Sequence, residues 1–276
     1  MELNSDFIRR AVMHGARLDW VASPIAGIDR RMLDRVGAEV ARATTIVRYA
    51  PDSQFSGHVH SGGEEILVLD GVFQDEHGDF PAGSYIRNPP QSRHTPGSRP
   101  GCTIFTKLWQ FDPADRTHVR IDTAKMPYVR PADRSDVELL PLFCDQREDV
   151  RLERWPTASR VRLALPGGGE FLVLDGRFEE AGDTFEPQSW LRLPPSGQLE
   201  AMAGPRGCTV WVPSRRSPLT VRLTTCAEKL ISASVPSAGE KRMVYPPDQS
   251  PAPMPRSELE CPDPALSRSK AEHGLN

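Results

Sequence analysis

Four side chains in the first half of the sequence have the types and spacing of a metal site: His58, His60, Glu64 and His94. On a β-strand, residues i and i+2 lie about 6.6 Å apart along the backbone and face the same side, so His58 and His60 can approach one ion. Imidazole and carboxylate groups are ligands for zinc, iron, manganese, nickel or copper. The sequence therefore predicts that these four residues bind a metal ion.

The segments between these residues can bring them together. Ser61-Gly62-Gly63 allows the chain to turn so that Glu64 comes back towards the two histidines. Pro89-Pro90 stiffens the approach to the strand that carries His94. Glu65 is the alternative carboxylate, but strand alternation places it on the opposite face from Glu64, where we expect a structural role.

The chain also repeats itself. Leu69-Asp70-Gly71 recurs as Leu174-Asp175-Gly176, and Pro89-Pro90 recurs as Pro194-Pro195, both at an offset of 105 positions. The tripeptide Gly-Cys-Thr occurs at 101–103 and again, one inserted residue later, at 207–209. Matching short segments in the same order and at nearly the same spacing indicate a tandem duplication. Two copies are too few for a solenoid.

Each copy has the pattern of β-structure. Short apolar runs end at Asp-Gly, a strong hairpin signal, and Gly and Pro punctuate the later runs, as is typical of a β-sandwich or barrel. The stretch 29–44 can also be read as an amphipathic helix, but we prefer strands because the corresponding residues 150–154 alternate with a period of two. The sequence thus predicts an all-β chain with a first domain at 1–120, a second at 121–233 and an extended or disordered proline-rich tail at 234–276.

The second copy lacks the candidate ligands. At the offset of 105, the three histidines correspond to Leu163, Leu165 and Leu199, and Glu64 corresponds to Gly169. A barrel without an ion is more stable with aliphatic side chains there than with unpaired imidazoles, which cost about 1–3 kcal/mol each. We therefore expect one metal site per chain and a structural second domain.

The His-x-His-x3-Glu segment with Gly71, and Pro81-x-Gly83 with His94, resemble the two motifs of the cupin family, and within it the ChrR-like group. The leading glycine of the first motif is displaced to Gly57, and the gap before His94 is longer than usual. The resemblance implies a double-stranded β-helix, or jelly roll, in two tandem copies (a bicupin). It also implies that His58, His60, Glu64 and His94 bind a single divalent ion, with iron or zinc favoured over manganese or nickel.

Two functions follow from this resemblance. The first is a dioxygenase-like oxidoreductase that cleaves a β-diketone or hydroxylated aryl ketone, with Tyr85, Cys102, Lys107 and Trp109 as candidate substrate-pocket residues and no other catalytic residue identified. The second is a metal-dependent sensor related to ChrR-type anti-sigma factors. A sigma-binding part is not evident, because the 57 residues before His58 contain one histidine and no cysteine. The sequence leaves the choice between enzyme and sensor open.

Composition limits the partners. The 276 residues carry 34 basic and 37 acidic side chains, a net charge of −3, which gives no electrostatic reason to bind nucleic acid or an anionic membrane. Five cysteines without a C-x-x-C pair indicate reduced thiols, and no secretory signal or membrane segment is evident. We expect a cytoplasmic protein with a small-molecule ligand, and a homodimer as a possible assembly through exposed edge strands.

Overall fold

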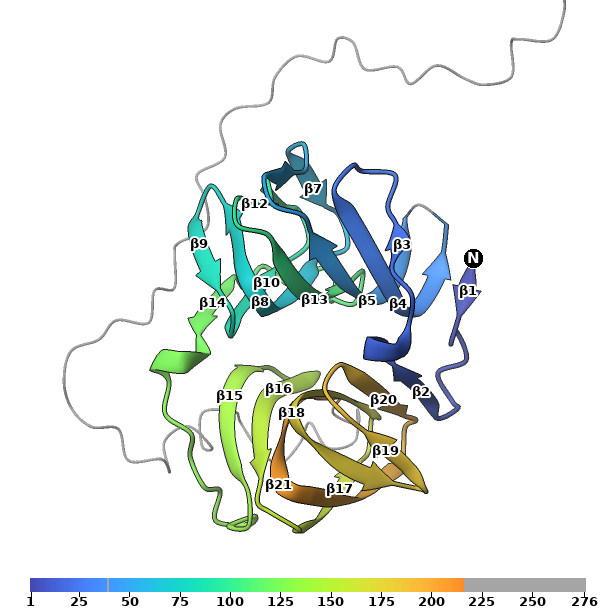
Figure 1. Ribbon diagram of the computed structural model, residues 1–276. Coiled ribbons are helices and arrows are strands. Elements are labelled where there is room, and N and C mark those ends of the chain that lie inside the picture. The colour runs from blue at the N-terminus through green and yellow to red at the C-terminus, as the bar shows by residue number, and fades with distance from the viewer. Residues whose placement is uncertain (39, 216–276) are drawn as a thin grey trace, which may run out of the picture. The chain divides into compact units, whose positions relative to one another are not determined.

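The computed structural model describes residues 1–38 and 40–215, and the proline-rich segment predicted at 234–276 lies outside these residues. The described part is built almost entirely of strands (Figure 1). The first half contains β1 (Glu2–Leu3), β2 (Ala11–His14), η1 (Gly15–Arg17), β3 (Val21–Ala22), β4 (Ile28–Gly37), β5 (Ala41–Tyr49), β6 (Ser53–Gln54), β7 (His58–His60), β8 (Glu64–Asp75), β9 (Gly78–Pro81), β10 (Ser84–Asn88), β11 (Ser92–His94), β12 (Gly97–Ser98) and β13 (Cys102–Leu108). The second half contains β14 (Val119–Asp122), η2 (Thr123–Lys125), β15 (Glu138–Cys144), β16 (Glu148–Trp155), β17 (Arg160–Leu165), β18 (Gly169–Glu180), β19 (Asp183–Phe185), β20 (Ser189–Leu193) and β21 (Gly197–Arg215).

These strands form two antiparallel assemblies, which we call the first and the second barrel. The first has the strand order β1-β4-β5-β13-β8-β10-β14, and β7 and β11 form a separate antiparallel pair. The second has the order β15-β16-β21-β18-β20-β2. The all-β prediction is confirmed, and the ambiguous stretch 29–44 forms strands β4 and β5.

The pairing registers confirm the duplication. In the first barrel His58 lies opposite His94, and in the second Leu163 lies opposite Leu199, the positions reached by adding 105. Gly71 and Gly176 each have φ of 72°, and a Cβ at either would lie within about 2 Å of a glycine carbonyl oxygen, 2.1 Å and 2.2 Å respectively. Each Asp-Gly therefore requires its glycine for the same reason, a left-handed backbone packed against another strand.

The two barrels exchange a strand. β2, which precedes the first barrel in sequence, pairs with β20 of the second, and β14, which precedes the second barrel, pairs with β10 of the first. A 3-10 helix follows each exchanged strand, η1 after β2 and η2 after β14 (Figure 1). The division predicted at residue 120 therefore does not separate two self-contained folding units, because each barrel uses a strand from the other's part of the sequence.

Three apolar clusters fill the structure. One lies inside the first barrel and includes Ile66, Phe73 and Ile104. Another lies inside the second barrel and includes Phe171, Phe178 and Leu199. The third joins the outer faces of both barrels, where the rings of Phe105 and Trp211, equivalent residues of the two copies, meet edge-to-face with centroids 5.0 Å apart.

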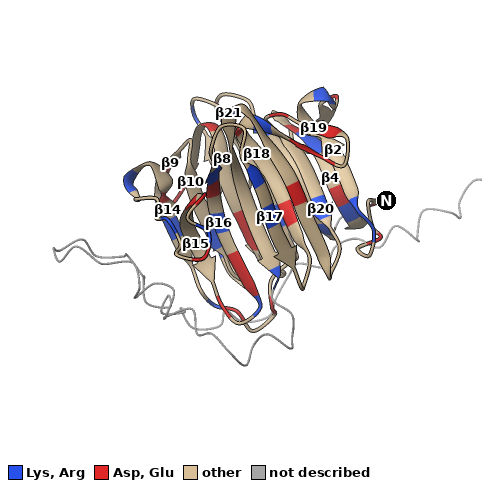
Figure 2. Cartoon of the chain, turned by 90° about the horizontal axis from the view of Figure 1, so that it is seen from below, with Lys and Arg blue, Asp and Glu red and all other residues tan. Residues whose placement is uncertain are grey.

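The face between the barrels also carries buried charge in a two-fold pattern. Arg87 of the first barrel pairs with Glu148 of the second at 2.7 Å, and its counterpart Arg192 pairs with Asp34 of the first at 3.0 Å. The carboxylate of Glu170 accepts hydrogen bonds from Lys107 and Trp190 at 2.7 and 3.0 Å. Basic and acidic segments lie next to one another on the strands of both barrels (Figure 2).

The cysteines follow the prediction of reduced thiols only in part. Cys102 and Cys208, equivalent residues of the two copies, are buried free thiols, whereas Cys144 is disulfide-bonded. Burial raises the pKa of Cys102 to about 11 and that of Cys208 to about 12, so both are neutral packing residues near pH 7. Over residues 1–38 and 40–215, no helix has the length and apolar character needed to cross a membrane.

We expect Glu170→Gln to destabilise the protein by about 3–5 kcal/mol, because the change leaves Lys107 buried without its anionic partner. The matched control is Glu186→Gln, which removes the exposed pair with Arg17 and should cost less than about 0.5 kcal/mol. Urea unfolding measures both free energies of unfolding. Equal losses for the two variants would show that the buried pair does not stabilise the contact between the barrels.

The contribution of Glu170 to the free energy of unfolding should depend on pH. Burial opposes ionisation of Glu170, but the charges of Lys107 and Arg42 and the hydrogen bonds from Lys107 and Trp190 together outweigh it and lower the pKa from 4.5 to about 2. Since the pKa in the folded state is lowered, the stabilisation by the carboxylate is complete above about pH 4.5 and is lost as the pH falls towards 2. The difference in unfolding free energy between wild type and Glu170→Gln should therefore narrow over this range. A difference that is constant between pH 6 and 2.5 would contradict the assignment.

Candidate metal centre

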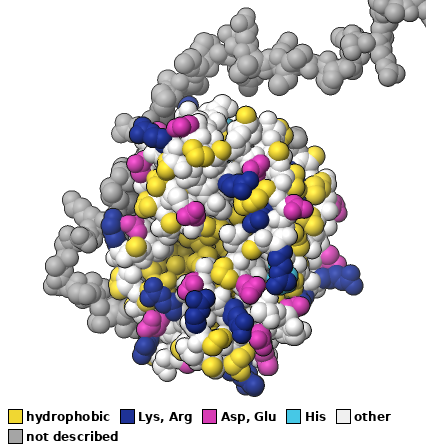
Figure 3. Space-filling model, viewed as in Figure 1, with side chains coloured by type: hydrophobic (Ala, Val, Ile, Leu, Met, Phe, Trp, Pro, Cys, Tyr) yellow, Lys and Arg dark blue, Asp and Glu magenta, His cyan; other side chains and the backbone are white. Residues whose placement is uncertain are grey.

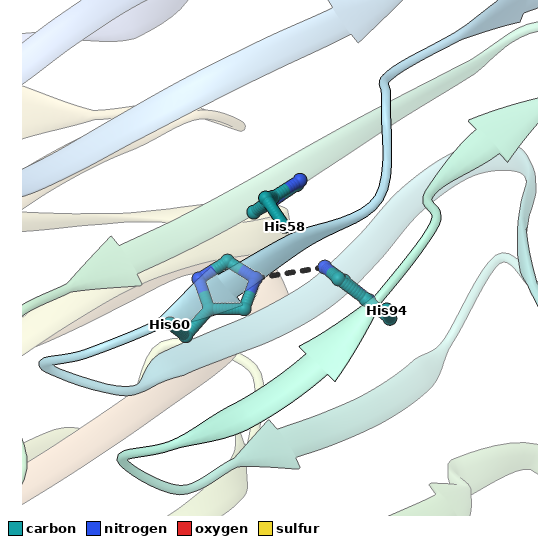
Figure 4. A group of neighbouring side chains, drawn as sticks. All are labelled: His58, His60 and His94. Carbon is teal, nitrogen blue, oxygen red and sulfur yellow. Dashed lines mark hydrogen bonds between the residues drawn. The ribbon is translucent and has the colours of Figure 1, made fainter. Parts of the chain in front are cut away.

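The predicted ligands lie close together in the first barrel, where β7 pairs with β11. His58 and His60 lie on β7, and β7 pairs with β11 so that His94 stands directly opposite His58. One nitrogen from each of the three imidazoles lies within 4.8 Å of the others, and Figure 4 shows the rings of His60 and His94 meeting with the ring of His58 beside them. The three histidines that the sequence singled out therefore lie next to one another.

Glu64 completes the group from the first position of β8. Its Oε2 atom lies 3.2 Å from Nε2 of His60 and 3.3 Å from Nε2 of His94, while the two Nε2 atoms are 2.8 Å apart. Donor atoms that share one ion at about 2.0–2.2 Å lie about 3.0–3.4 Å from one another. The two distances from Glu64 fit a single small cation, and the two Nε2 atoms lie slightly closer together than this range.

One buried atom argues directly for that cation. Oε2 of Glu64 has no hydrogen-bond partner although it is buried, whereas Oε1 accepts a hydrogen bond from Thr106 Oγ1 at 3.3 Å. A buried carboxylate oxygen without a partner is costly unless a cation or proton neutralises it. The residues present therefore fit a divalent ion.

Neighbouring acceptors fix which nitrogen each ring can offer. The carbonyl oxygen of Ser56 lies 2.9 Å from Nδ1 of His58, and Oδ2 of Asp75 lies 3.3 Å from Nδ1 of His94. An Nδ1–H that donates to these oxygens leaves the Nε2 lone pair free for a metal. Asp75 was not singled out in the sequence, because it lies 19 residues before His94 with no motif linking them.

The pKa values reflect burial and the neighbouring charges. Burial lowers the pKa of His60, with Glu64 opposing the shift. Burial acts in the same direction on His94, but its hydrogen bond with Asp75 and the negative charges of Glu64, Asp75 and Glu76 together outweigh burial and raise the pKa. For Asp75 itself burial favours the neutral acid, yet its hydrogen bonds with His94 and with the backbone of His77, together with the charges of these histidines, leave its pKa lowered, so the carboxylate stays charged and orients the ring.

Two glycines shape the turn between the ligands. A Cβ at Gly62 would lie 2.2 Å from the Trp109 ring, and Gly63, with φ of 76°, has its Cβ position 2.5 Å from the Phe111 ring. The turn that returns Glu64 to the histidines thus depends on having no side chain at these two positions. Trp109 also donates its backbone N–H to Gly63 O at 3.2 Å.

The four predicted pocket residues occupy different places. Trp109 is 46% exposed and covers the turn that carries Glu64, which makes it the member closest in structure to the ligand turn. Cys102 is buried within the first barrel's apolar cluster. Tyr85 donates to Glu65 Oε1 at 2.5 Å and Lys107 binds Glu170, so both lie on the face between the barrels. Glu65 has the structural role expected of it.

A separate hollow of about 220 Å³ lies among apolar residues of both barrels, with Leu67, Leu69, Leu152 and Leu174 in its lining. Hydrophobic side chains also gather in the middle of the face shown in Figure 3. None of the four candidate ligands lines this hollow. The hollow is therefore distinct from the metal centre.

The fold is similar to that of a solved cupin barrel domain protein. Residues 9–112 match the family model of the ChrR Cupin-like domain, so this part of the chain is similar to ChrR-like cupins. Among solved structures, a dioxygenase candidate from Nostoc punctiforme is similar to the chain with 16% identity and a TM-score of 0.61, over 80% of this chain and 83% of that one. No curated protein sequence matches the chain.

Two further structures share the fold. Escherichia coli YhhW, a pirin determined in complex with nickel(II), has 12% identity and a TM-score of 0.55 over 75% of this chain and 98% of that one. The oxalate decarboxylase of Lactobacillus farciminis, determined as a formate complex, has 9% identity and a TM-score of 0.54 over 81% of this chain and 93% of that one. At these identities the likeness shows the fold alone.

We expect the purified protein to contain about one metal ion per chain, and His94→Ala to lose it. Asp75→Asn should weaken metal affinity about 10- to 100-fold, because the ring of His94 loses the anion that orients it. The matched control is Glu180→Gln at the corresponding position of the second barrel, where the carboxylate pairs with Arg10. Elemental analysis and chelator competition measure both quantities. Two ions per chain, or unchanged metal content in His94→Ala, would contradict the assignment.

Proposed function

We propose that the protein is a metal-dependent enzyme of the dioxygenase type, a bicupin with one active half that acts on a small β-diketone or hydroxyaryl ketone in the cytoplasm. The observation that carries the proposal is the buried Oε2 of Glu64, which faces His60 and His94 without a hydrogen bond. The likeness in fold between this chain and the dioxygenase candidate from Nostoc punctiforme supports an oxidation by dioxygen as the class of reaction.

The donor set favours an enzyme over a purely structural ion. Four protein ligands leave one or two positions open on an ion that accepts five or six, as iron, manganese and nickel do. A redox-active ion such as iron, when bound, would supply the activation of dioxygen. A metal ion that only stabilises the barrel is a weaker hypothesis. The second barrel lacks all four ligands and still has a continuous apolar core.

The protein's own residues would hold and shield the reacting centre. Asp75 orients His94, and Thr106 holds Oε1 of Glu64 so that Oε2 points to the histidines. Phe55 and Phe73 lie against the rings of His58 and His94, with centroids 5.9 and 6.1 Å apart, and limit the access of water from inside the barrel. Trp109 lies over the ligand turn, where a substrate would approach from solvent.

The test is oxygen consumption by the full chain loaded anaerobically with Fe(II). Acetylacetone and a 2-hydroxyaryl ketone are the first members of the panel, and we expect substrate-dependent oxygen uptake that is abolished in His94→Ala. The zinc-loaded protein is the control and should show no uptake. An iron-loaded protein without uptake across the panel would contradict the enzyme proposal, and tight zinc that iron cannot replace would favour the metal-dependent sensor.

A further inference from the structure

Asn88, at the end of β10, is a buried side chain whose amide has no partner. The residue is 3% exposed, and its Nδ2 atom forms no hydrogen bond. An amide nitrogen in this state costs about 1–3 kcal/mol. Such a cost needs an explanation, and the position of the residue suggests one.

Asn88 lies beside the metal centre. In the pairing of β10 with β8 it stands directly opposite Glu64, so the two side chains share a face with Cβ atoms about 5 Å apart. Ile86, two residues earlier on the same face, belongs to the apolar cluster inside the first barrel, whereas Arg87 points to the other barrel. The amide of Asn88 is therefore directed into the barrel, next to the ligands.

A second unpaired polar atom borders the same place. Oγ of Ser92 is buried without a hydrogen bond, and Ser92 stands opposite His60 and two residues before His94 on β11. Its side chain thus lies on the same face as the histidines. One amide donor and one hydroxyl flank the cluster formed by His60, Glu64 and His94.

The second barrel shows that the fold does not need these groups. The counterparts of Asn88 and Ser92 at the offset of 105 are Leu193 and Gly197. Leu193 packs in the apolar cluster with Leu165 and Leu199, which stand where the first barrel has His60 and His94. The amide and the hydroxyl are therefore present only in the barrel that has the metal ligands.

We propose that Asn88 is a substrate-positioning residue, whose Nδ2 donates a hydrogen bond to an oxygen of the ligand that binds beside the metal, with Ser92 as an additional polar contact. This inference rests on the proposed function and adds a recognition element to it. The ligand class is a small oxygen-bearing anion, such as a β-diketonate, because an N–H donor next to a cation selects an oxygen acceptor over an apolar group.

The experiment measures ligand binding apart from turnover. The full chain is loaded with Co(II), and its visible absorption is followed during titration with acetylacetone. Asn88→Leu introduces the residue of the second barrel, and we expect unchanged cobalt content with at least about tenfold weaker binding of acetylacetone. The metal-free variant should melt at the same or a higher temperature than the wild type, because it no longer buries an unpaired donor.

The matched control is Ser98→Ala, which also introduces the second-barrel residue, Ala203, at a buried position. The hydroxyl of Ser98 already donates to Val72 O at 2.6 Å, so this change should leave acetylacetone affinity unaltered. Asn88→Ala is the second variant if Asn88→Leu does not fold.

Three results would overturn the inference. The first is an unchanged affinity for acetylacetone in both Asn88 variants, and the second is a loss of bound cobalt from these variants. The third is a lower melting temperature of the metal-free Asn88→Leu variant, which would show that Asn88 forms a stabilising bond inside the protein. If the cobalt-loaded wild type binds cobalt but no acetylacetone, the proposed substrate class fails and the inference falls with it. If instead the wild type and the Asn88 variants bind acetylacetone equally well, only the role of Asn88 is wrong and the proposed substrate class stands.

Discussion

Each barrel has one sheet face that must be covered by the other, and this mutual burial organises the structure. The face includes aromatic residues such as Phe105 and Trp211, and it also contains Arg87 and Arg192, each neutralised by a carboxylate of the opposite barrel. A buried charge without its partner is costly, so neither barrel can leave the other without exposing apolar surface and separating ion pairs. The metal centre stands on the inner side of a sheet that this contact holds in place.

The sequence was sufficient for the all-β fold, the duplication and the three converging histidines. These three features depend on signals that can be read in the sequence: strand alternation at His58 and His60, Asp-Gly turns, and a fixed offset between repeated short segments. The strand exchange could not be predicted in the same way, because β2 and β14 are short and share few identical residues. Their partners are set by three-dimensional contact with the other barrel.

The same limit applies to the site. Asp75 and Asn88 adjoin the ligands through pairing across strands, and no motif connects them to the histidines in sequence. Tyr85 and Lys107 were chosen as pocket residues because they lie on neighbouring strands, yet alternation turns both to the face between the barrels. A register shift of one residue reverses the face of every side chain on a strand, so the pocket lining depends on the pairing register.

The exchange of β2 and β14 has a consequence for how the two copies could diverge. In a symmetric pair of identical subunits, any substitution occurs twice, so ligands cannot disappear from one site only. Here both exchanged strands belong to one polypeptide, which makes their local concentration high and independent of dilution. Selection can then act on each half separately, and Leu163, Leu165 and Leu199 can replace imidazoles in one half while the other half keeps its chemistry.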